Sequence, residues 1–385
     1  MTTTNALSGQ HVIVIGAGYA GLMCALQLAP AVRVTLVDPA GYFTERIRSH
    51  QRATDRPDIT HPLSGFLGPA GITHVPARVT ALVPGAGEIR TDDGQILRYD
   101  RLVYALGSRT AGTGAWGGTG TWAGTGAGSG AASAGHAFTP ESAGELHKRL
   151  LDGPGSLAVV GGGLTGIELA AEIAETRPRW AVRLVTAGPV GAGLSGPGRD
   201  HVRRVLAARG VGLDEGHHVA GPGEVDADVV VWAASMTGRT ELAAAAGLAM
   251  TGDRIAVGPA LRSLSHPGIY AAGDAAASAS PAAGRLRMAC ATALPTGAHA
   301  ARAVLADLRG EETPPLRFRF HIQCISLGRR DGLVQRVHAD DSPRRQILTG
   351  RPAAAVKEQI VRSTAGALRL AVRHPGAAAR IVGAS

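Results

Sequence analysis

The chain has 385 residues, which is enough for two or three domains with cores of their own, and a formal net charge of +9. Its three cysteines lie far apart and form no C-x-x-C pair, which argues against a zinc site or a redox disulfide, and we predict no metal site. With so few cysteines, no apolar run of eighteen residues and no basic, apolar leader, we expect a soluble, cytoplasmic protein.

The first predicted element is a buried parallel strand at residues 12–15, which leads into a glycine-rich turn. The turn carries three glycines in the pattern G-x-G-x-x-G: Gly16, Gly18 and Gly21. The first permits a tight turn, the second lets the backbone approach a pyrophosphate, and the third lets a helix pack close to the strand. That helix, starting near Tyr19, would direct its positive end at the phosphate. A second strand at residues 32–37 ends in Asp38, which is placed to bind a ribose.

Further strands follow before a second glycine-rich turn. Residues 75–83 and 88–97 are predicted as short antiparallel strands, with a turn at Asp93-Gly94. Residues 101–106 are predicted as a buried strand that stops at Gly107. Residues 110–135 are rich in Gly, Ala, Thr and Ser and nearly free of charge, so we expect a mobile linker or lid there.

The second glycine-rich turn follows an apolar strand at residues 157–160 and repeats the spacing of the first: Gly161, Gly163 and Gly166. Its second strand, residues 182–185, ends at Thr186 and not at an acid, so a ribose 2′-hydroxyl lacks its usual partner. No arginine follows directly to hold a 2′-phosphate, and the choice between NADH and NADPH stays open. Two such turns indicate two dinucleotide sites with electron transfer between them.

One more motif precedes the C-terminal region. A short apolar strand at residues 269–272 leads into Gly273-Asp274. An acid there, just ahead of small residues that let a helix start close by, suits a hydrogen bond to a ligand hydroxyl.

The positive charge is concentrated at the end of the chain. Residues 317–385 hold 13 Arg or Lys and 4 Asp or Glu, a net of +9, so residues 1–316 balance at zero. This segment is either a solvated surface or a docking region for acidic lipid, an acidic partner or a polyanionic cofactor. Nothing in it resembles a nucleic-acid reader.

A moderately amphipathic helix is predicted at residues 352–372. Val356, Ile360, Leu368 and Leu370 lie near one face, with Lys357 elsewhere. We favour a domain-packing or homodimer role for this helix over binding to a membrane surface, because it lacks Trp and Phe and Gly366 interrupts it.

Together these motifs resemble the pyridine nucleotide-disulfide oxidoreductase superfamily. The matching pieces are VIVIGAGYAG with Asp38, LVYALGS at 102–108, VVGGGLTGIELAAE, and IYAAGDAA at 269–276, spread over residues 11–310. The segment 43–51, FTERIRSHQ, has no cysteine where disulfide reductases carry their pair. The chain therefore looks most similar to the branch of type II NADH:quinone oxidoreductases and apoptosis-inducing-factor-like NAD(P)H oxidoreductases.

This resemblance implies an α/β fold with two three-layer, Rossmann-like dinucleotide-binding domains and a small C-terminal α+β domain. The first domain would bind FAD and be split into residues 1–110 and 255–312. A linker or lid at 111–137 would lead to an inserted NAD(P)H-binding domain at 138–254, and 313–385 would form the C-terminal domain.

Site residues can be carried over from the resemblance. Asp38 would bind the adenosine ribose, Val79 would offer backbone to adenine, and Asp274 would bind the ribityl or pyrophosphate end. A helix opening near Thr292 to Gly297, limited by Pro295, could point its positive end at flavin N1 and O2. The FAD site would comprise Gly16, Ala17, Gly18, Ala20, Gly21, Asp38, Val79, Gly107, Asp274, Thr292 and Ala293. The NAD(P)H pyrophosphate would lie on Gly161, Gly163 and Gly166.

Glu168 is the candidate catalytic residue closest to the chemistry. It lies two residues beyond Gly166 on the second helix, on the side expected to face the contact between nicotinamide and flavin. An uncompensated carboxylate there is costly, so we expect Arg46 or Arg48 beside it. A structural ion pair that ties two domains together explains Glu168 equally well. His50, in the segment that could line the other face of the flavin, is a candidate proton donor or surface residue.

The sequence thus predicts an FAD-dependent NAD(P)H oxidoreductase that reduces a quinone-like or other small organic acceptor. One alternative is a biosynthetic flavin-dependent oxidase or dehydrogenase that acts on a secondary metabolite. Another is an FAD-binding redox sensor that docks a partner through its basic C-terminal region.

Overall fold

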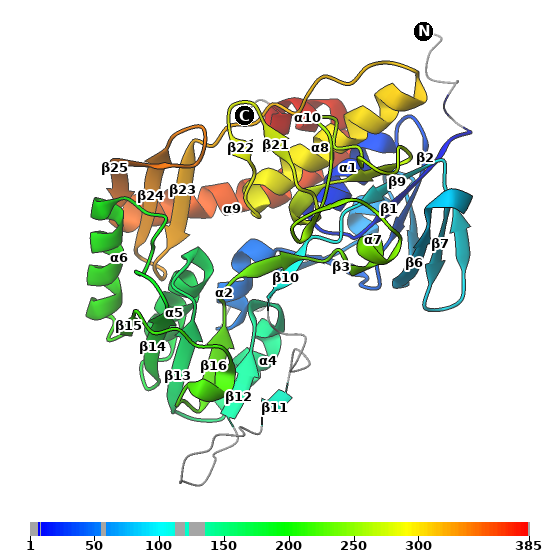
Figure 1. The fold of residues 1–385 in the computed structure, drawn as a ribbon. Helices are drawn as coiled ribbons and strands as arrows, with labels where there is room; N and C mark the ends of the chain where they lie inside the picture. Colours follow the sequence, from blue (N-terminus) through cyan, green and yellow to red (C-terminus); the bar gives the residue numbers. More distant parts are fainter. Residues whose placement is uncertain (1–6, 8, 55–58, 112–119, 123–134, 384–385) are drawn as a thin grey trace.

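The computed structural model describes residues 7, 9–54, 59–111, 120–122 and 135–383. Most of the predicted linker or lid at 110–135 therefore lies outside the described residues. Figure 1 shows three parts: a first sheet with α1 and α8 beside it, a second sheet with α5, and a three-stranded sheet from which α9 runs toward α1 and α8. These labels are defined below.

The first sheet has five parallel strands in the order β20-β9-β1-β2-β5. Its strands are β1 (His11–Ile15), β2 (Arg33–Val37), β5 (Thr73–Val75), β9 (Arg101–Tyr104) and β20 (Ile269–Ala271). Val12 and Val14 pack with α1 (Tyr19–Leu28) and α8 (Cys290–Leu308) on one face of the sheet. Ile13 and Ile15 pack on the other face, which is covered by an antiparallel sheet of β6 (Val79–Val83), β7 (Glu88–Thr91) and β8 (Ile96–Arg98). Burial on both faces explains the unbroken apolar run.

The predicted strand at residues 75–83 is wrong, because two strands of different sheets occupy it. β5 ends at Val75 in the parallel sheet, and β6 begins at Val79 in the antiparallel sheet. Pro76 lies between them and has no N–H to continue a ladder. The predicted turn at Asp93-Gly94 is confirmed: β7 and β8 pair on either side of it, and Gly94 has φ +84°.

The second sheet has the order β11-β12-β16-β13-β14-β15, and all its pairings are parallel except that of β11 with β12. Its strands are β11 (Gly120–Trp122), β12 (Gly135–Phe138), β13 (Ser156–Val160), β14 (Ala181–Thr186), β15 (Gly212–Glu215) and β16 (Val229–Trp232). Its helices are α4 (Ala143–Leu151), α5 (Leu164–Thr176) and α6 (Gly196–Ala208). Leu157 and Val159 pack with these helices, and Ala158 and Val160 face a second cluster that includes Trp232. The α/β fold with two Rossmann-like units is confirmed.

Two short strands join the two sheets. β10 (Ser108–Thr110) pairs antiparallel with β17 (Met236–Gly238), one before and one after the second sheet in the chain. β20 then returns to the first sheet beside β9. The first sheet is therefore built from two separate segments of the chain. The residue limits predicted above for the split FAD-binding domain, the linker, the inserted domain and the C-terminal domain stay predictions.

The last part is α+β, as predicted. β23 (Ile322–Ser326), β24 (Gly332–Val337) and β25 (Pro343–Thr349) form an antiparallel sheet, followed by α9 (Gly350–Arg373) and α10 (Pro375–Gly383). The predicted apolar face of α9 is right at Leu368, which is fully buried, but wrong near the start of the helix: Lys357 is only 7% exposed, whereas Val356 is 37% exposed. Lys357 is buried because it has a charged partner, described below. Within the described ranges, no helix has both the length and the apolar character needed to cross a bilayer.

The remaining elements are short. They are β3 (Tyr42–Thr44), η1 (Arg46–Arg48), α2 (Ser49–Arg52), β4 (Thr60–Pro62), α3 (Ser64–Leu67), η2 (Pro84–Ala86), η4 (Pro140–Ser142), η5 (Pro222–Glu224), α7 (Glu241–Ala245), β18 (Met250–Thr251), β19 (Arg254–Ile255), η6 (Gly273–Ala275), β21 (Ala279–Ser280) and β22 (Gly284–Arg285).

Helices α1 and α8 approach each other at backbone distance. A Cβ added to Gly297 would overlap the backbone of Ala20, so only glycine allows this contact. α8 begins at Cys290 and continues through Pro295, so the expectation that Pro295 limits the helix is wrong. Proline removes one backbone hydrogen bond, and the buried packing of α8 on α1 outweighs that loss.

We expect Gly297→Ala to lower the free energy of unfolding by about 1–3 kcal/mol, because the new methyl group forces α1 and α8 apart. Gly366→Ala is the matched control: Gly366 is exposed on α9, and no atom of the described residues lies within 4 Å of an added Cβ. Alanine there should stabilise the protein by up to about 1 kcal/mol. Urea denaturation measures both, and equal effects would contradict the packing argument.

Candidate functional site

The three glycines of the first turn have three different environments. Gly16 has φ +102°, and a Cβ there would lie 2.5 Å from the carbonyl oxygen of Ala105. A Cβ on Gly21 would overlap the carbonyl oxygen of Gly16, so this glycine lets α1 pack close to the turn. At Gly18, no atom of the described residues lies within 4 Å of an added Cβ. The turn is therefore closed at two glycines and open at the one expected to approach a pyrophosphate.

Asp38 lies directly beside this turn. Its Oδ2 accepts a hydrogen bond from the N–H of Ala17 at 2.8 Å, and its Oδ1 accepts one from the N–H of Ala40 at 2.9 Å. Val79 begins β6 and packs in the cluster that contains Val37, the residue before Asp38. The structure thus gathers the predicted ribose and adenine residues at one end of β2.

Asp274 is held by the residues that follow the end of β9. Its Oδ2 accepts a hydrogen bond from the Ser108 hydroxyl at 2.6 Å, next to Gly107, which has φ +70°. The Gly273 N–H donates to the Thr296 hydroxyl at 3.0 Å, which docks η6 on α8. The Asp274 Oδ1 atom is buried and finds no hydrogen-bond partner among the described residues. An orphaned buried acceptor fits a hydroxyl-bearing ligand such as the ribityl chain of FAD.

The start of α8 differs in detail from the prediction. The N–H groups of Thr292 and Ala293 both donate to the carbonyl of Ala289, at 3.1 Å each, so they are already used. The helix begins at Cys290, and the first N–H groups of a helix lack intrahelical partners. The positive end of this helix therefore lies at Cys290, two residues before the position predicted. Burial and the Asp274 carboxylate raise the pKa of the Cys290 thiol to about 12.

The second turn repeats the construction of the first. Gly161 has φ +122°, and a Cβ there would lie 2.8 Å from the backbone of Ala233. A Cβ on Gly166 would overlap the carbonyl oxygen of Gly161, while Gly163 is open to 4 Å among the described residues. The first N–H of each turn donates to the neighbouring strand, Gly16 to Val37 at 2.9 Å and Gly161 to Val185 at 2.8 Å. The turns at residues 16–21 and 161–166 are therefore built in the same way, and we call them the first and the second cradle.

Glu168 lies on the first turns of α5 and faces a cation, but not the cation predicted. Lys357 Nζ lies 2.9 Å from its Oε1, which also accepts the Ser326 N–H at 2.9 Å. Burial alone would raise the pKa of the Glu168 carboxyl, but the Lys357 ammonium group and the hydrogen bond from the Ser326 N–H outweigh it and hold the pKa below its usual value. Burial likewise opposes the charge on Lys357, and Glu168 reverses that effect and raises the pKa of Lys357.

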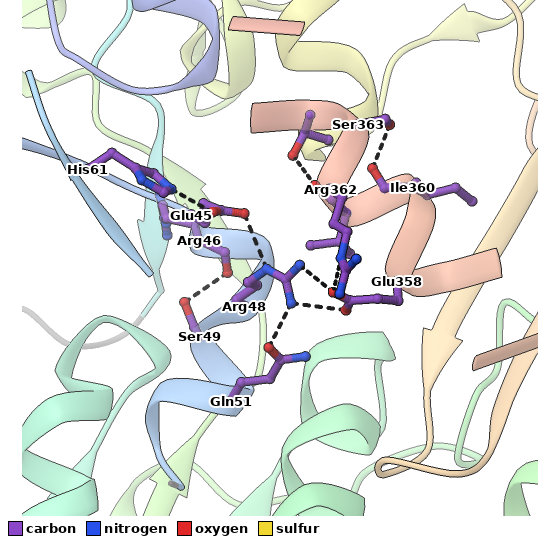
Figure 2. Close-up of polar contacts among 12 residues, drawn as sticks. Glu45, Arg46, Arg48, Ser49, Gln51, His61, Glu358, Ile360, Arg362 and Ser363 are labelled. Atoms are coloured by element: carbon purple, nitrogen blue, oxygen red, sulfur yellow. Dashed lines mark hydrogen bonds and ion pairs between the residues drawn. The ribbon is translucent and has the colours of Figure 1, made fainter. Parts of the chain in front are cut away.

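Arg46 and Arg48 are engaged elsewhere, so their prediction as partners of Glu168 is wrong. Arg46 donates to the Ser108 carbonyl at 2.8 Å and to Glu141 at 2.9 Å. Figure 2 shows Arg48 between Glu45 and Gln51 of its own segment and Glu358 of α9. Both Glu358 oxygens accept from Arg48, at 2.9 and 3.0 Å. Arg48 thereby fixes the segment 45–51 against α9.

His50 completes the group around Glu168. Its Nδ1 lies 3.7 Å from Glu168 Oε2, and its Nε2 is buried without a hydrogen-bond partner among the described residues. Burial is the main cause that lowers the pKa of His50 to about 4, so the ring is neutral at pH 7. At pH 7 His50 therefore adds no charge to the group and holds no imidazolium proton to donate.

Lys357 and Glu172 are the residues that the sequence did not reveal. Glu172, one helical turn after Glu168, is fully buried and pairs with Arg329 Nε at 2.6 Å. The four-residue spacing of these two acids on one helix was a usable signal. The signal for Lys357 was weaker: it is one of only two lysines in an arginine-rich chain.

We expect Lys357→Met to lower the free energy of unfolding by about 3–5 kcal/mol, because it leaves the Glu168 carboxylate buried without its cation. Adding Glu168→Gln should recover part of the loss. Lys148→Met, at the other and exposed lysine, is the control and should change stability by less than about 0.5 kcal/mol. Urea denaturation of the four proteins is the measurement. Equal stability of Lys357→Met and the parent would contradict a buried pair.

A second prediction concerns pH. The His50 pKa is about 4 in the folded protein and 6.5 in the unfolded chain, so unfolding takes up a proton between these values. The free energy of unfolding should therefore fall as pH drops from 6.5 to 4, and His50→Gln should reduce that fall. His218→Gln, at an exposed histidine, is the control variant. Identical pH profiles for all three proteins would argue against a buried neutral ring.

Comparison with known proteins places these features in a family. A family model described as pyridine nucleotide-disulphide oxidoreductase matches residues 10–303. The chain is 30% identical over 384 residues to NADH dehydrogenase-like protein Rv1812c of Mycobacterium tuberculosis, covering 91% of this chain and 92% of that one. It is 27% identical over 178 residues, 44% of each chain, to a type II NADH:quinone oxidoreductase of Staphylococcus aureus.

Solved structures show the same fold. The sulfide:quinone oxidoreductase of Aquifex aeolicus matches with a TM-score of 0.72 at 19% identity, over 94% of this chain and 92% of that one. NDH2 of Plasmodium falciparum in complex with NADH matches with a TM-score of 0.70 at 12% identity, over 95% and 97%. At such identities the likeness is one of fold.

The family model covers both glycine-rich turns, Asp274 and the start of α8. The protein is accordingly an oxidoreductase whose cofactors are FAD and NAD(P)H. The chain belongs to the pyridine nucleotide-disulphide oxidoreductase family.

Proposed function

We propose that this oxidoreductase transfers a hydride from NAD(P)H to FAD and then passes the electrons to a quinone-like small organic acceptor. The observation that carries the proposal is the junction at Glu168. The second cradle, through α5, meets the C-terminal helix α9 there, and the charges of Asp274, Lys357 and Glu168 all influence the pKa of the Cys290 thiol at the start of α8.

The residues of the first cradle fit FAD. The open backbone at Gly18 would receive the pyrophosphate, Asp38 the ribose, and the orphaned Oδ1 of Asp274 a hydroxyl of the ribityl chain. When bound, FAD supplies the electron transfer between a two-electron donor and the acceptor. The second cradle, open at Gly163, would hold the pyrophosphate of NAD(P)H.

A direct acceptor is supported by the cysteines. Cys24, Cys290 and Cys324 are all free, and the segment 43–51 presents Arg46, Arg48 and His50 where a disulfide reductase has its cysteine pair. Electrons therefore need an external acceptor. A quinone agrees with the names of two relatives, the type II NADH:quinone oxidoreductase and the sulfide:quinone oxidoreductase.

In this proposal the acceptor binds beside Lys357 and Glu168, and these two side chains give that region its charge. Lys357 keeps a proton on Nζ because Glu168 raises its pKa, so it can place a positive charge beside an acceptor oxygen that gains electrons. Glu168 Oε1 and the Cys324 carbonyl, 2.9 and 3.3 Å away, fix the position of that ammonium group. The segment 45–51 closes one side of this region through neutral His50, next to Glu168, and through the hydrogen bonds of Arg48 to Glu358.

Anaerobic mixing of the FAD-loaded protein with NADH or NADPH tests the proposal. We expect the flavin absorbance to bleach and menadione to restore it faster than oxygen does. A protein that cannot be reconstituted with FAD would overturn the cofactor assignment. A reduced flavin that menadione and ferricyanide both fail to reoxidise would overturn the acceptor assignment.

Two matched variants separate the cradles. Gly18 and Gly163 have ordinary φ values of −75° and −78° and open surroundings among the described residues, so valine fits the fold at both. Its side chain would occupy the space of a pyrophosphate. We expect Gly18→Val to lose FAD. Gly163→Val should keep FAD and its reduction by dithionite but slow reduction by NAD(P)H about 100-fold. Equal FAD content and equal reduction rates in both variants would contradict the assignment.

A further inference from the structure

The two cradles differ at one equivalent position. Asp38 follows Val37 at the end of β2, and Thr186 follows Val185 at the end of β14; both valines accept the first N–H of their turn. Asp38 bonds the N–H of Ala17, the second residue of its turn. Thr186 instead packs over Gly162, the second residue of the other turn, where an added Cβ would lie 2.6 Å from Thr186 Oγ1. A negative charge near the ribose in the first cradle is thus replaced by a neutral hydroxyl in the second.

The acid closest in register does not replace the missing charge. Glu215 of β15 pairs with Thr186, but its Oε1 accepts the Val190 N–H at 2.5 Å and both its oxygens accept from Arg203, at 2.7 and 3.0 Å. These bonds to Val190 and Arg203 lower the pKa of Glu215 and commit it to holding the loop after β14. Asp214, the preceding residue, points to the other side of the strand and contacts His217 at 2.9 Å.

One cation beside this loop remains available. Arg199 lies one turn before Arg203 on α6, and its Cγ is 3.7 Å from the position of a Cβ on Gly191, in the same loop. It interacts electrostatically with Glu215. Within the described ranges, no hydrogen bond or ion pair holds its guanidinium group. With Glu215 already paired with Arg203, Arg199 is the cation near this loop that has no bonded acid among the described residues.

We propose that the second cradle prefers NADPH over NADH, with Arg199 binding the 2′-phosphate and Thr186 admitting it. A carboxylate at position 186 would bind a ribose diol and repel that phosphate, whereas the Thr186 hydroxyl does not repel it and the Arg199 guanidinium attracts it. The inference rests on the proposed function, because it requires that the second cradle holds the nicotinamide nucleotide.

Binding of adenosine fragments tests this independently of catalysis. We expect calorimetry to show 2′,5′-ADP binding about 10- to 100-fold tighter than 5′-AMP, as a charge-assisted contact to one phosphate allows. Arg199→Ala should remove that difference and Arg199→Lys should retain part of it. Arg204→Ala, an exposed arginine of the same helix, is the control and should leave it unchanged. Equal affinity for the two fragments, or equal effects of Arg199→Ala and Arg204→Ala, would overturn the proposal.

Flavin reduction gives the second readout. NADPH should reduce the flavin with a higher kcat/KM than NADH, and Thr186→Glu should reverse the order. A preference for NADH in the parent protein overturns this inference and leaves the proposed function standing. Failure of both nucleotides to reduce a bound flavin overturns the proposed function itself. FAD content and dithionite reduction of each variant show whether it has folded.

Discussion

The buried pair of Lys357 and Glu168 is the interaction on which the arrangement of the three parts depends. Each charge is unfavourable alone in a water-poor interior, and each shifts the pKa of the other so that both stay ionised. Lys357 belongs to the C-terminal helix α9 and Glu168 to α5 of the second sheet. The Ser326 N–H from β23 joins the same oxygen. This pair of side chains therefore anchors the place where the last part of the chain meets the nucleotide-binding part.

The contact extends along α5 through a row of acids. Glu168, Glu172 and Glu175 follow one another at spacings of four and three residues, which places them on one side of the helix. Arg329 meets this row twice, with its side chain on Glu172 and its N–H on Glu175 at 2.8 Å. Gly328, with φ +85°, brings the loop so close that any side chain there would overlap Glu175. The loop between β23 and β24 is thus shaped to fit α5.

The sequence predicts what depends on local spacing and fails where distant charges meet. Gly16, Gly18 and Gly21 are close neighbours, so their spacing alone predicts a turn whose closed and open positions the structure confirms. The partner of Glu168 is nearly half the chain away, and the sequence offered Arg46 and Arg48, which other acids occupy. A lysine on an amphipathic helix is expected to face water, and only the presence of a buried acid explains its burial. Which turn holds which cofactor stays a prediction.

A nucleotide-binding unit of this type could be expected to work as an interchangeable module. Here the row of acids on α5 ties the second unit to the C-terminal part of its own chain. A second unit separated from the C-terminal part would expose Glu168 and Glu172 without their cations, and Glu175 would keep Arg209 but lose the Arg329 N–H. A foreign unit inserted in its place would have to bring acids at the same three positions to engage Lys357 and Arg329. The place of the nucleotide-binding unit in this protein therefore depends on side chains of the C-terminal part, Lys357 on α9 and Arg329 before β24, as much as on its own fold.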